Sequence, residues 1–555
     1  MATDHAAASQ THFARRATGF VRDVKVSDAV IFNVLPACPG LVMAVSIFWV
    51  LTAFSGVNVY ACIVITAICS FLISGAFGLL SQIMPRSGAD YILISRSLHP
   101  ALAVGSSILI GASSMLAMGY WGVFTAKICI GPMLTMVGVA ANSSTLQSWG
   151  GTIASKPWDM LVGFGEIALL ALIMAYGMRF MMRVQFWLFT LGMVGFGVAA
   201  LTLLTTSRSS FISSYNTYAK PFTHRADTYH YFLAQAGKAG TNLSTTTDWH
   251  NTIVASGAFI AFGVWVWFST NLAGEIRQAG TRKNWYSMLG GLAVTFGSIL
   301  IMIGLLYHTI GQQFLTAVTA VSGDPTVYTL PNAPWWITLV AAIHTNTLFV
   351  AFLGITFVCW APLIVYIQIV QPVRALFAWA FDQVIPEQIA QINERTHTPV
   401  LLLGVIAVAS LPFLYAAAYT TSFFKYIALS TIVGFPTFVL VGIGAILFPY
   451  KKKAAYEASV SNINFAGIPL MVFFGVGSIA AGIFGAWLWL EYPQLGLPGA
   501  GKSLADQLFT SPGSGGLALI ATCLIAGAII FYVGKAWRKS QGIDLSLNYL
   551  EIPPE

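Results

Sequence analysis

The stretch PACPG, residues 36–40, interrupts the apolar run IFNVLPACPGLVMAVSIFWV at 31–50. Proline has no backbone N–H and clashes with the preceding helical turn, so this stretch has the composition of a turn. Its flanks, however, are apolar enough to belong to a membrane-spanning helix. In a bilayer, such a break survives only where the freed backbone groups are buried in protein or line an aqueous cavity. A helix that is kinked at proline but continuous is the alternative.

The composition of the whole chain indicates an integral membrane protein. Of its 555 residues, 57% are hydrophobic and only 8% are charged, and the mean hydropathy is +0.76. About a quarter of the residues in a soluble domain are charged, so this chain cannot cover itself with a surface that faces water. The net charge of +8 does not indicate nucleic-acid binding, because Lys and Arg occur in short loops between apolar segments. The six cysteines lie within apolar segments, which argues against a disulfide framework.

A helix needs about 20 mainly apolar residues to cross the hydrocarbon core of a membrane. Most of the 27 Lys and Arg residues lie between such stretches on the side that holds both termini. Because cytoplasmic loops are enriched in Lys and Arg, we expect a plasma-membrane protein with both termini in the cytoplasm. The twelve stretches are 28–52, 58–83, 101–136, 158–177, 181–204, 252–276, 286–310, 336–370, 399–417, 422–448, 466–490 and 515–536.

The segments between and beyond these stretches complete the predicted organisation. Residues 205–251 are polar with scattered aromatic residues, and we expect them to form an ordered extracellular cap or lid. Residues 374–400 are amphipathic and predict a short helix along the inner interface. The predicted order is a cytoplasmic tail (1–26), five helices (27–204), the extracellular loop (205–251), five helices (252–448), two further helices (449–537) and a cytoplasmic tail (538–555).

The sixth apolar stretch has an anomaly that matches PACPG. Residues 255–278 read ASGAFIAFGVWVWFSTNLAGEIRQ, with Gly257 and Gly263 in a segment that otherwise predicts a helix. The first and sixth segments are five helices apart and enter the membrane from opposite sides. This is the pattern of an inverted repeat, in which two interrupted helices build a binding site near the middle of the membrane. The predicted fold is all-α, with about twelve spanning helices arranged as a five-plus-five inverted repeat and two extra helices.

Two interrupted helices would offer opposite partial charges to a ligand. The N-terminus of a half-helix presents free N–H groups to an anion, and unwound carbonyl groups suit a cation. An amino acid carries both charges. Trp265 or Trp267 would close over the substrate and attract its ammonium group, with packing against lipid or protein as the alternative for each. The candidate substrate-binding residues at the breaks are Ala37, Cys38, Pro39, Gly40, Phe262, Gly263, Val264, Trp265 and Trp267.

Three motifs, taken in order, resemble those of the amino acid–polyamine–organocation (APC) transporter superfamily. MPRSGADYILISRSLHP at 84–100 resembles the Pro-Arg-Ser-Gly-Gly-x-Tyr signature that follows the second helix of the family. GEIRQAGTRKN at 274–284 resembles the acidic and then basic stretch that closes the sixth helix. RALFAWAFDQVIPEQIAQINERTHTPV at 374–400 resembles the segment after the eighth helix, including its final Thr-Pro-Val. With the twelve-span pattern, the resemblance extends over nearly the whole chain.

The resemblance implies a LeuT-like fold and coupled uptake or exchange of amino acids or related amines. It implies a site between segments one, three, six and eight, where Thr356 and Trp360 would face the substrate. The chain departs from the family at both breaks, because PACPG replaces a glycine-rich stretch and Trp265-Val266-Trp267 replaces Gly-Phe-acid. Some relatives have a lysine on helix five in place of a sodium ion, and helix five here has none. The substrate and the coupling ion therefore stay open.

Lys127 and Glu166 are the charged residues that lie deepest within the apolar segments. Counted inward from the outer ends of segments three and four, both lie about 12–15 Å deep at about 1.5 Å per residue. Equal depth on consecutive helices predicts an ion pair. Ionisable residues within a membrane are functional candidates, and a purely structural pair is the alternative.

Four further residues near the inner ends of the helices are candidates for gating or coupling. Arg86 and Asp90 would lock a closed inner gate, with simple anchoring at the interface as the alternative. Asp28 and Glu275 would titrate during transport, unless they are solvated residues at helix ends.

These features predict a secondary active transporter that moves amino acids or related amines by alternating access, with a proton favoured over sodium or exchange. The second hypothesis is a membrane protein that does not transport and acts as a sensor or as a subunit of a larger complex. The sequence has no P-loop, no zinc-type His and Cys spacing and no nucleophile elbow, so we expect neither an enzyme nor a bound cofactor or metal. The expected partners are the small-molecule substrate, the proton and the lipid bilayer. The oligomeric state stays open.

Overall fold

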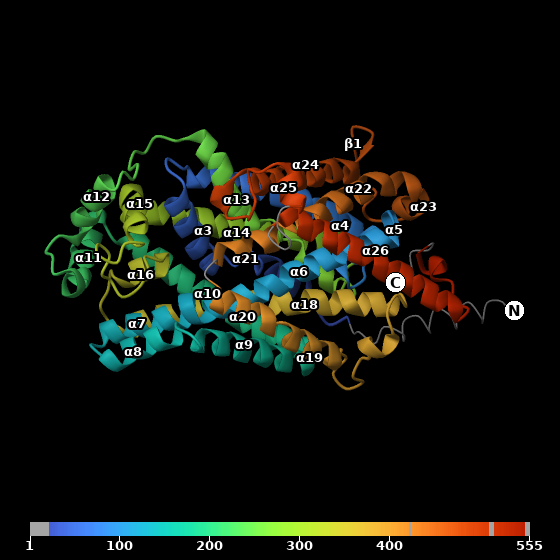
Figure 1. Cartoon of the computed structure of the whole chain (residues 1–555), viewed down its shortest axis with the longest axis horizontal. Coiled ribbons are helices and arrows are strands. Elements are labelled where there is room, and N and C mark those ends of the chain that lie inside the picture. Colours follow the sequence, from blue (N-terminus) through green and yellow to red (C-terminus); the bar gives the residue numbers. More distant parts are fainter. Residues whose placement is uncertain (1–21, 421–422, 510–514, 550–555) are drawn as a thin grey trace.

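The computed structural model describes residues 22–420, 423–509 and 515–549. Twelve helices are long and apolar enough to cross a membrane, and they run along the long axis of the molecule (Figure 1). In these ranges the strands are β1 (Asn464–Phe465) and β2 (Ile468–Pro469), which pair antiparallel in a small hairpin. The chain is therefore an all-α membrane protein, as the sequence predicts.

The membrane-spanning helices are numbered 1 to 12 in chain order, and several consist of consecutive elements. They are α2 (Val26–Val34) with α3 (Pro39–Ala53), α4 (Val59–Ile83), α6 (Pro100–Phe124) with the π-helix η1 (Thr125–Ile130) and α7 (Gly131–Ala140), α9 (Trp158–Ala175), α10 (Met178–Thr205), α13 (Trp249–Gly263) with the 3₁₀ helix η2 (Phe268–Leu272), α14 (Arg282–Thr309), α17 (Thr347–Val358) with α18 (Trp360–Phe381), α19 (Val400–Ala409) with α20 (Leu411–Tyr419), α21 (Phe423–Ile432) with α22 (Phe435–Lys451), α24 (Leu470–Glu491) and α26 (Gly516–Ser540). The shorter helices are α5 (Ala89–Ser97), α8 (Ser144–Ile153), α11 (Arg208–Thr223), α12 (Thr228–Lys238), α15 (Gln312–Val321), α16 (Trp336–Ala341), α23 (Lys453–Glu457), α25 (Leu504–Phe509), and the 3₁₀ helices η3 (Glu387–Ala390), η4 (Pro493–Leu495) and η5 (Leu545–Tyr549).

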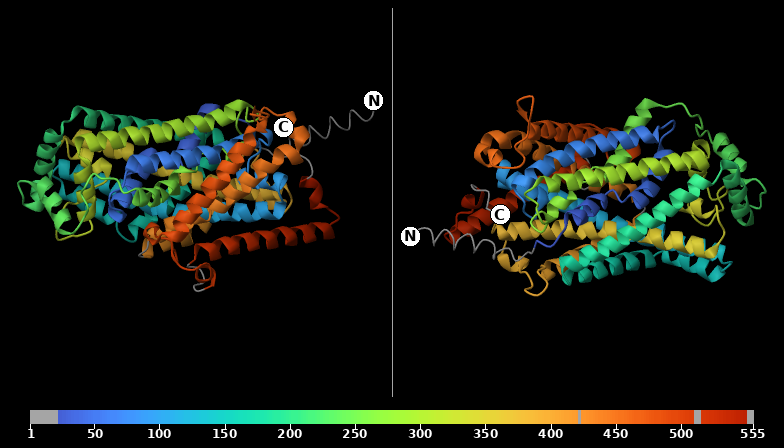
Figure 2. Two further views of the ribbon diagram at one scale, coloured as in Figure 1. Left: turned by 90° about the horizontal axis from the view of Figure 1, so that it is seen from above. Right: turned by 180° about the vertical axis from the view of Figure 1, so that it is seen from behind.

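Helices 1 and 6 lie at the centre of the bundle. In each, 94% of the most apolar 18-residue window is buried, against 28% in helix 4 and 22% in helix 12. Helix 12 runs along one side of the bundle (Figure 2). The two segments whose sequences predict a break are thus enclosed by other helices, where an interrupted backbone can be tolerated.

Polar residues at the ends of the apolar stretches determine where helices begin. Asn58 Oδ1 accepts a hydrogen bond from Ala61 N–H (3.1 Å) at the start of helix 2, and Asp248 Oδ1 accepts one from Asn251 N–H (3.0 Å) at the start of helix 6. Each satisfies one of the backbone donors that a helix leaves free. Asp248 N–H also donates to Gly56 O at 2.8 Å, which joins the starts of helices 2 and 6.

The bundle has two distinct ends (Figure 1). We call the end with α11, α12 and α15 the cap end, and the end near both chain termini the terminal end. In the cap, Tyr229 of α12 stacks on Phe314 of α15 with ring centroids 4.0 Å apart. Arg208 Nη2 at the start of α11 donates to Tyr307 O (2.8 Å) and His308 O (3.0 Å) of helix 7. Residues 208–223 and 228–238 thus form ordered helices at this end of the bundle, and the extracellular location of the cap stays a prediction.

Helix 8 starts later than the predicted stretch 336–370. The short helix α16 ends at Ala341, and a new helix starts at Thr347. Asn346 caps this new helix, because its Oδ1 accepts a hydrogen bond from Phe349 N–H at 3.0 Å. The apolar residues before Asn346 therefore belong to a separate element.

Helix 8 also ends later than predicted, at Phe381. The first part of 374–400 is thus the end of a spanning helix, and the rest forms turns and the short η3. The prediction of an interfacial helix over 374–400 is wrong, because Arg374 is buried against Glu275 instead of facing the interface.

Candidate functional site

Helix 1 is interrupted at PACPG. α2 ends at Val34, α3 starts at Pro39, and the residues between them form turns. Cys38 has a left-handed backbone conformation with a φ of 34°, which residues other than Gly, Asn and Asp rarely adopt. Its N–H donates to Val34 O at 2.9 Å, and Pro39 has no N–H with which to continue the helix. The prediction of a true interruption is confirmed, and the alternative of a continuous, kinked helix is wrong.

Helix 6 is interrupted at the predicted place as well. α13 ends at Gly263, turns follow as far as Trp267, and the chain continues as the 3₁₀ helix η2. The buried side chain of Asn33 joins the two breaks, because its Oδ1 accepts from Ser269 N–H at 2.9 Å. Its Nδ2 donates to Ser287 Oγ of helix 7 at 3.4 Å. A buried amide with partners on both sides holds the two interrupted helices in one register.

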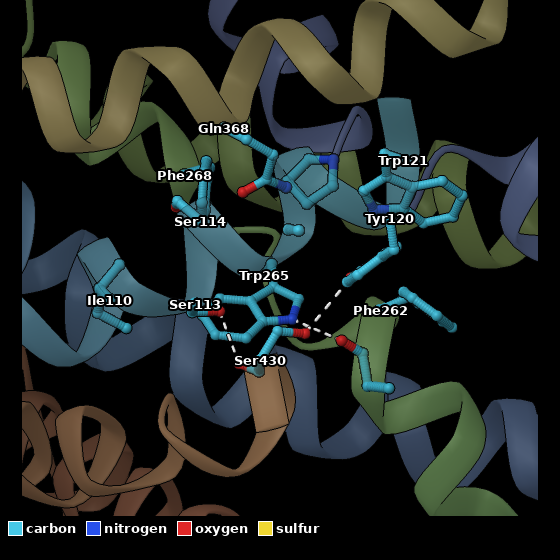
Figure 3. Close-up of a pocket in the computed structure, with 13 residues that line it drawn as sticks. Ile110, Ser113, Ser114, Tyr120, Trp121, Phe262, Trp265, Phe268, Gln368 and Ser430 are labelled. Atoms are coloured by element: carbon cyan, nitrogen blue, oxygen red, sulfur yellow. Dashed lines mark hydrogen bonds between the residues drawn. The ribbon is translucent and has the colours of Figure 1, made fainter. Parts of the chain in front are cut away.

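A small cavity lies where the two breaks face helices 3, 8 and 10 (Figure 3). Its volume is about 30 Å³, which is space for about one or two water molecules. This is less than any amino acid occupies, so the site is closed in this structure. The cavity is lined by Pro36, Ile110, Ser113, Ser114, Ala117, Tyr120, Trp121, Ala261, Phe262, Trp265, Phe268, Gln368 and Ser430.

Hydroxyl groups on helices 3 and 10 meet at the cavity. Ser113 Oγ donates to the carbonyl oxygen of Ser430 at 2.6 Å, and Ser430 Oγ donates to Tyr120 Oη at 3.4 Å (Figure 3). The indole N–H of Trp265 donates to Ala261 O at 2.7 Å, in the helical turn before the break. The cavity therefore combines aromatic walls with hydroxyl groups that can both donate and accept hydrogen bonds.

None of the side chains that line the cavity is charged. Helix ends therefore supply the electrostatics of the site. α3 starts at the break with the positive end of its dipole, whereas α2 and α13 end at the breaks with their negative ends. This arrangement suits a ligand that carries both a carboxylate and an ammonium group.

Of the predicted substrate-binding residues, Phe262 and Trp265 line the cavity. Two candidates of the first break instead contact Trp360 of helix 8. Cys38 Sγ donates to Trp360 O at 3.5 Å, and the Trp360 indole packs directly on Gly40. The remaining candidates of the breaks are buried without lining the cavity in this closed form: Ala37, Pro39, Gly263 and Val264.

Trp267 and Thr356 pack against neighbouring helices. Trp267 stacks on Phe77 of helix 2, with ring centroids 4.0 Å apart and ring planes inclined by 21°. Thr356 Oγ1 bonds back to carbonyl groups of its own helix, and its side chain fills the space over Gly195 of helix 5. The packing alternative thus describes Trp267, whereas Trp265 belongs to the cavity wall.

The sequence interpretation missed the wall contributed by helix 3. Ser113, Ala117 and Trp121 recur at intervals of four residues, so they share one face of the helix. This spacing is a signal from which the wall could have been predicted. Gln368 and Ser430 offer no comparable signal, because each is a single polar residue whose orientation depends on tertiary packing.

Two buried ion pairs close the terminal end. Arg374 Nη2 donates to Glu275 Oε2 at 3.0 Å, and both side chains are 2% exposed. Arg96 donates two hydrogen bonds of 2.7 Å to Asp382, and Tyr91 Oη donates to the same carboxylate at 2.8 Å. Burial raises the pKa of the Glu275 carboxyl, and the neighbouring Arg374 acts in the opposite direction. The alternative that Glu275 is a solvated residue at a helix end is wrong.

The C-terminal 3₁₀ helix η5 packs on the second ion pair. Tyr549 Oη lies 3.1 Å from Tyr91 Oη, and the guanidinium of Arg96 lies 5.2 Å from the centroid of the Tyr549 ring. Asn548 Nδ2 donates to Asp382 O at 3.2 Å. The C-terminal segment therefore contributes to the closed terminal end.

The segment before helix 1 is joined to the end of helix 6. Val24 N–H donates to Glu275 O at 3.0 Å, and Arg277 N–H donates to Val24 O at 2.8 Å. Asp23 lies 2.8 Å from Arg179 and 3.4 Å from Arg277. The hydrogen bond from Arg179 and the two positive charges lower the pKa of Asp23. The chain that enters helix 1 is thus fixed to the chain that leaves helix 6.

Asp28 and Arg86 have local structural partners. Asp28 Oδ2 accepts from Lys25 N–H at 3.0 Å at the start of α2. The guanidinium of Arg86 lies 5.4 Å from the centroid of the Phe381 ring, and burial lowers its pKa. Arg86 and Asp90 make no contact with each other among the described interactions, so the closed end depends on the two ion pairs.

The predicted ion pair of Lys127 with Glu166 is wrong. Lys127 Nζ lies 3.0 Å from Asp159 Oδ2 at the start of helix 4, and Glu166 Oε2 accepts from Thr125 Oγ1 at 2.6 Å. Lys127 and Thr125 lie in the π-helix η1, whose wider turn alters the register that a straight α-helix would give. The long lysine side chain also reaches toward the start of helix 4, so matched depth on two helices did not identify its partner.

A larger hollow of about 630 Å³ lies between helices 10, 11 and 12. Its lining is almost wholly apolar, and it lies away from both breaks. The small cavity has the convergent polar groups that a specific ligand site requires, so we take it as the candidate site.

Comparison with known proteins assigns no family, because no protein-family model matches the chain and no curated protein matches it significantly. Within the part of the chain that the structure describes, no group of three or more His, Cys, Asp and Glu side chains could hold a metal ion. Function therefore has to be argued from the breaks, the cavity and the closed terminal end.

Proposed function

We propose that this protein is a secondary active transporter that moves amino acids or related amines across the plasma membrane by alternating access. The observation that carries this proposal is the cavity at two interrupted helices in the centre of a twelve-helix bundle. Discontinuous helices near the middle of a membrane commonly form the binding sites of transporters. The three motifs that resemble the APC superfamily support the same function, and with it a LeuT-like inverted repeat.

The chemistry of the cavity supports a small zwitterion or amine as the substrate. Its carboxylate would lie at the N-terminus of α3, and its ammonium group near the carbonyl ends of α2 and α13 and the ring of Trp265. Ser113 and Ser430 would bind polar substituents. Because no charged side chain lines the cavity, an amine with a net positive charge would have only the carbonyl ends of α2 and α13 and the Trp265 ring to stabilise it, so a zwitterionic amino acid fits better than an amine.

Transport requires the closed cavity to open to each side in turn. In this proposal the terminal end faces the cytoplasm, and the two ion pairs separate there when the site opens inward. The cap end then faces outward. Reporter fusions at positions 145 and 325 should report the outside, and fusions at 90, 280 and 455 the inside. One reproducible inversion among the five would contradict this orientation.

A proton is the favoured coupling ion. Two carboxyl groups have neutral hydrogen-bond partners in place of cations: Glu166 accepts from Thr125, and Asp90 accepts from Ser106. A carboxyl group in such surroundings is stable when it is protonated.

A membrane sensor or a subunit of a larger complex is the second candidate. The observation that favours it is the closed cavity of about 30 Å³, which would have to expand before any amino acid could bind. Such a protein would bind or assemble without net movement of a solute.

Uptake by the purified protein in proteoliposomes tests the proposal. We expect saturable uptake of at least one labelled amino acid or amine, increased by an inward proton gradient. Ala117→Trp should abolish it, because the new side chain fills the cavity. Leu201→Trp places the same side chain on the exposed surface of helix 5 and should leave uptake intact. Absence of both uptake and binding across a broad panel would overturn the proposal.

A further inference from the structure

Asp90 is a buried carboxylic acid in the first turn of α5, outside the membrane-spanning segments. Its Oδ2 accepts from Ser106 Oγ of helix 3 at 2.7 Å, and Ser106 Oγ lies 2.8 Å from Thr437 Oγ1 of helix 10. Its Oδ1 has no hydrogen-bond partner of ordinary geometry, although the N–H groups of Asp90 and Tyr91 lie near the carboxyl. Burial raises the pKa of Asp90 to about 7.

Among the residues that the structure describes, no cation forms an ion pair with Asp90. α5 packs against helices 2, 3, 8 and 10 and against η2. α4, α6 and η2 contain no Asp, Glu, Lys or Arg. The charged and titratable groups on the surrounding elements have other partners or lie far along their helix. Tyr91 and Arg96 bind Asp382, Arg374 binds Glu275, Arg86 lies over Phe381, Tyr120 bonds with Ser430, and Tyr366 bonds with Met178. Tyr450 and Lys451 are at the far end of α22, and Tyr60, Cys62 and Cys69 are in the first half of α4, away from the end that leads to α5.

The contact between helices 3 and 10 connects Asp90 with the cavity. Ser106 and Ser113 are two turns apart on one face of helix 3. Ser430 and Thr437 are likewise seven residues apart in helix 10, one in α21 and the other in α22. Because these helices run antiparallel, Ser113 meets Ser430 at the cavity (2.6 Å), and Ser106 meets Thr437 beside Asp90 (2.8 Å). The two contacts are separated by about 10 Å along the helix axis.

Helix 10 is interrupted between these two contacts, where α21 ends and α22 begins. The indole of Trp265 packs directly on Gly434 at this interruption, and any larger side chain there would collide with the ring. Trp265 also lines the cavity. A substrate that displaces Trp265 therefore acts on helix 10 between Ser430 and Thr437.

We propose that Asp90 is the proton-binding group of this transporter, and that the contact between helices 3 and 10 couples its protonation to the cavity. The inference rests on the proposed function. While the site is open at the cap end, water that enters from that side delivers one proton to the carboxylate and forms its O–H bond. The neutral acid is then buried as Ser106 and Thr437 come together. When the terminal end opens, α22 moves away from Ser106, water reaches the carboxyl, and the O–H bond breaks with release of the proton to that water.

Exchange and accumulation in proteoliposomes separate coupling from substrate binding. Asp90→Asn imitates the protonated acid, so we expect it to keep exchange of labelled for unlabelled substrate at equal pH. It should lose accumulation driven by a proton gradient. Asp324→Asn, the same substitution at an exposed residue of the cap end, should keep both activities.

The outcomes distinguish the two proposals. Accumulation by Asp90→Asn at the wild-type level would overturn the role of Asp90 and leave the transporter function intact. A wild-type protein that shows neither exchange nor accumulation would overturn the proposed function itself.

Ser106→Ala provides a second variant that retains the carboxyl group. The hydrogen bond from Ser106 stabilises the carboxylate, so its loss should move the pH of half-maximal accumulation upward. Ser107→Ala is the matched control, because the neighbouring Ser107 is buried and its hydroxyl makes no hydrogen bond. An unchanged pH dependence in Ser106→Ala would overturn the proposal.

Infrared difference spectroscopy gives a readout that does not depend on transport. The spectra are taken in a Glu166→Gln background, because Glu166 is a second buried carboxyl group that bonds to a neutral partner. With Asp90 intact, this protein should show the C=O band of a protonated carboxylic acid that disappears as the pH rises through about 7. Asp90→Asn should lack this change and Asp324→Asn should retain it. Persistence of the same titrating band in Asp90→Asn would assign the proton to another group and overturn the proposal.

Discussion

The cavity and the terminal end place polar groups inside the same bundle in opposite ways. The cavity has hydroxyl groups, an amide and aromatic rings, and none of its side chains is charged. The terminal end holds full charges in two buried pairs, Arg374 with Glu275 and Arg96 with Asp382. Neutral polar groups can exchange one partner for another at small cost, whereas a buried ion is stable only with its counter-ion. In the proposed transporter, the cavity would therefore adjust gradually to a substrate, whereas the terminal end would be either fully closed or fully open.

The largest expected effect is the loss of stability when one member of a buried ion pair is neutralised. Glu275→Gln leaves Arg374 charged and buried, which should cost about 3–5 kcal/mol of stability. The double variant Glu275→Leu with Arg374→Met should recover most of this loss. Thermal unfolding in detergent measures both, with Ser113→Ala in the cavity as a control that loses only about 1 kcal/mol. Equal losses of stability in Glu275→Gln and Ser113→Ala would contradict the contrast between the terminal end and the cavity.

The second effect is a pH dependence of stability that arises at Asp90. Burial raises its pKa to about 7, from an ordinary value of about 4. The folded protein therefore binds this proton more tightly than the unfolded chain, so its contribution to stability is complete below about pH 4 and declines as the pH rises to about 7. At about 1.4 kcal/mol per pKa unit, the decline is at most about 4 kcal/mol. The melting temperature of wild type and of Asp90→Asn, measured as a function of pH, tests this. The same pH dependence in both proteins would contradict the prediction.

Two neighbouring tryptophans have different roles: Trp265 lines the cavity, and Trp267 packs against helix 2 outside it. Trp265→Phe removes the indole that lines the cavity, and we expect substrate affinity to fall about tenfold, which corresponds to about 1.4 kcal/mol. Trp267→Phe changes a ring that stacks on Phe77 outside the cavity and should leave affinity nearly unchanged. Binding of a labelled substrate measures both, and the reverse order would place the substrate elsewhere.

A smaller effect is expected at Lys127, whose side chain is 37% exposed while that of Asp159 is buried. A double-mutant cycle of Lys127→Met with Asp159→Asn should give a coupling energy of about 1 kcal/mol. The cycle of Lys127→Met with Glu166→Gln should be additive. Folded yield and melting temperature measure each cycle, and coupling to Glu166 in place of Asp159 would contradict the observed pair.

The smallest effect is a change in labelling rate at Cys38. All six cysteines are buried, so a water-soluble thiol reagent should react slowly with the closed protein. Cys38 lies at the break of helix 1, so we expect it to react first when the site opens and more slowly with saturating substrate. A variant that retains only Cys38 and reacts at a rate indifferent to every transported substrate would show that the break is never hydrated.

The breaks could be predicted from the sequence because their causes are local. Proline and glycine act on the backbone at their own positions, and PACPG and Gly263 mark both interruptions. The orientation of helix faces is a tertiary property, so Gln368 and Ser430 were not expected at the cavity. The alternative that Glu275 is solvated could not be ruled out from the sequence for the same reason, since its partner Arg374 lies far away in the sequence.

The two links between helices 1 and 6 have a mechanical consequence. Asn33 joins the breaks, and Val24 joins the segments that lie beyond them at the terminal end. Two separate attachments remove most of the freedom of one half-helix to rotate or slide against the other. The terminal halves of helices 1 and 6, α2 and η2, then move as one rigid unit. A displacement of either one at the cavity therefore displaces both at the terminal end.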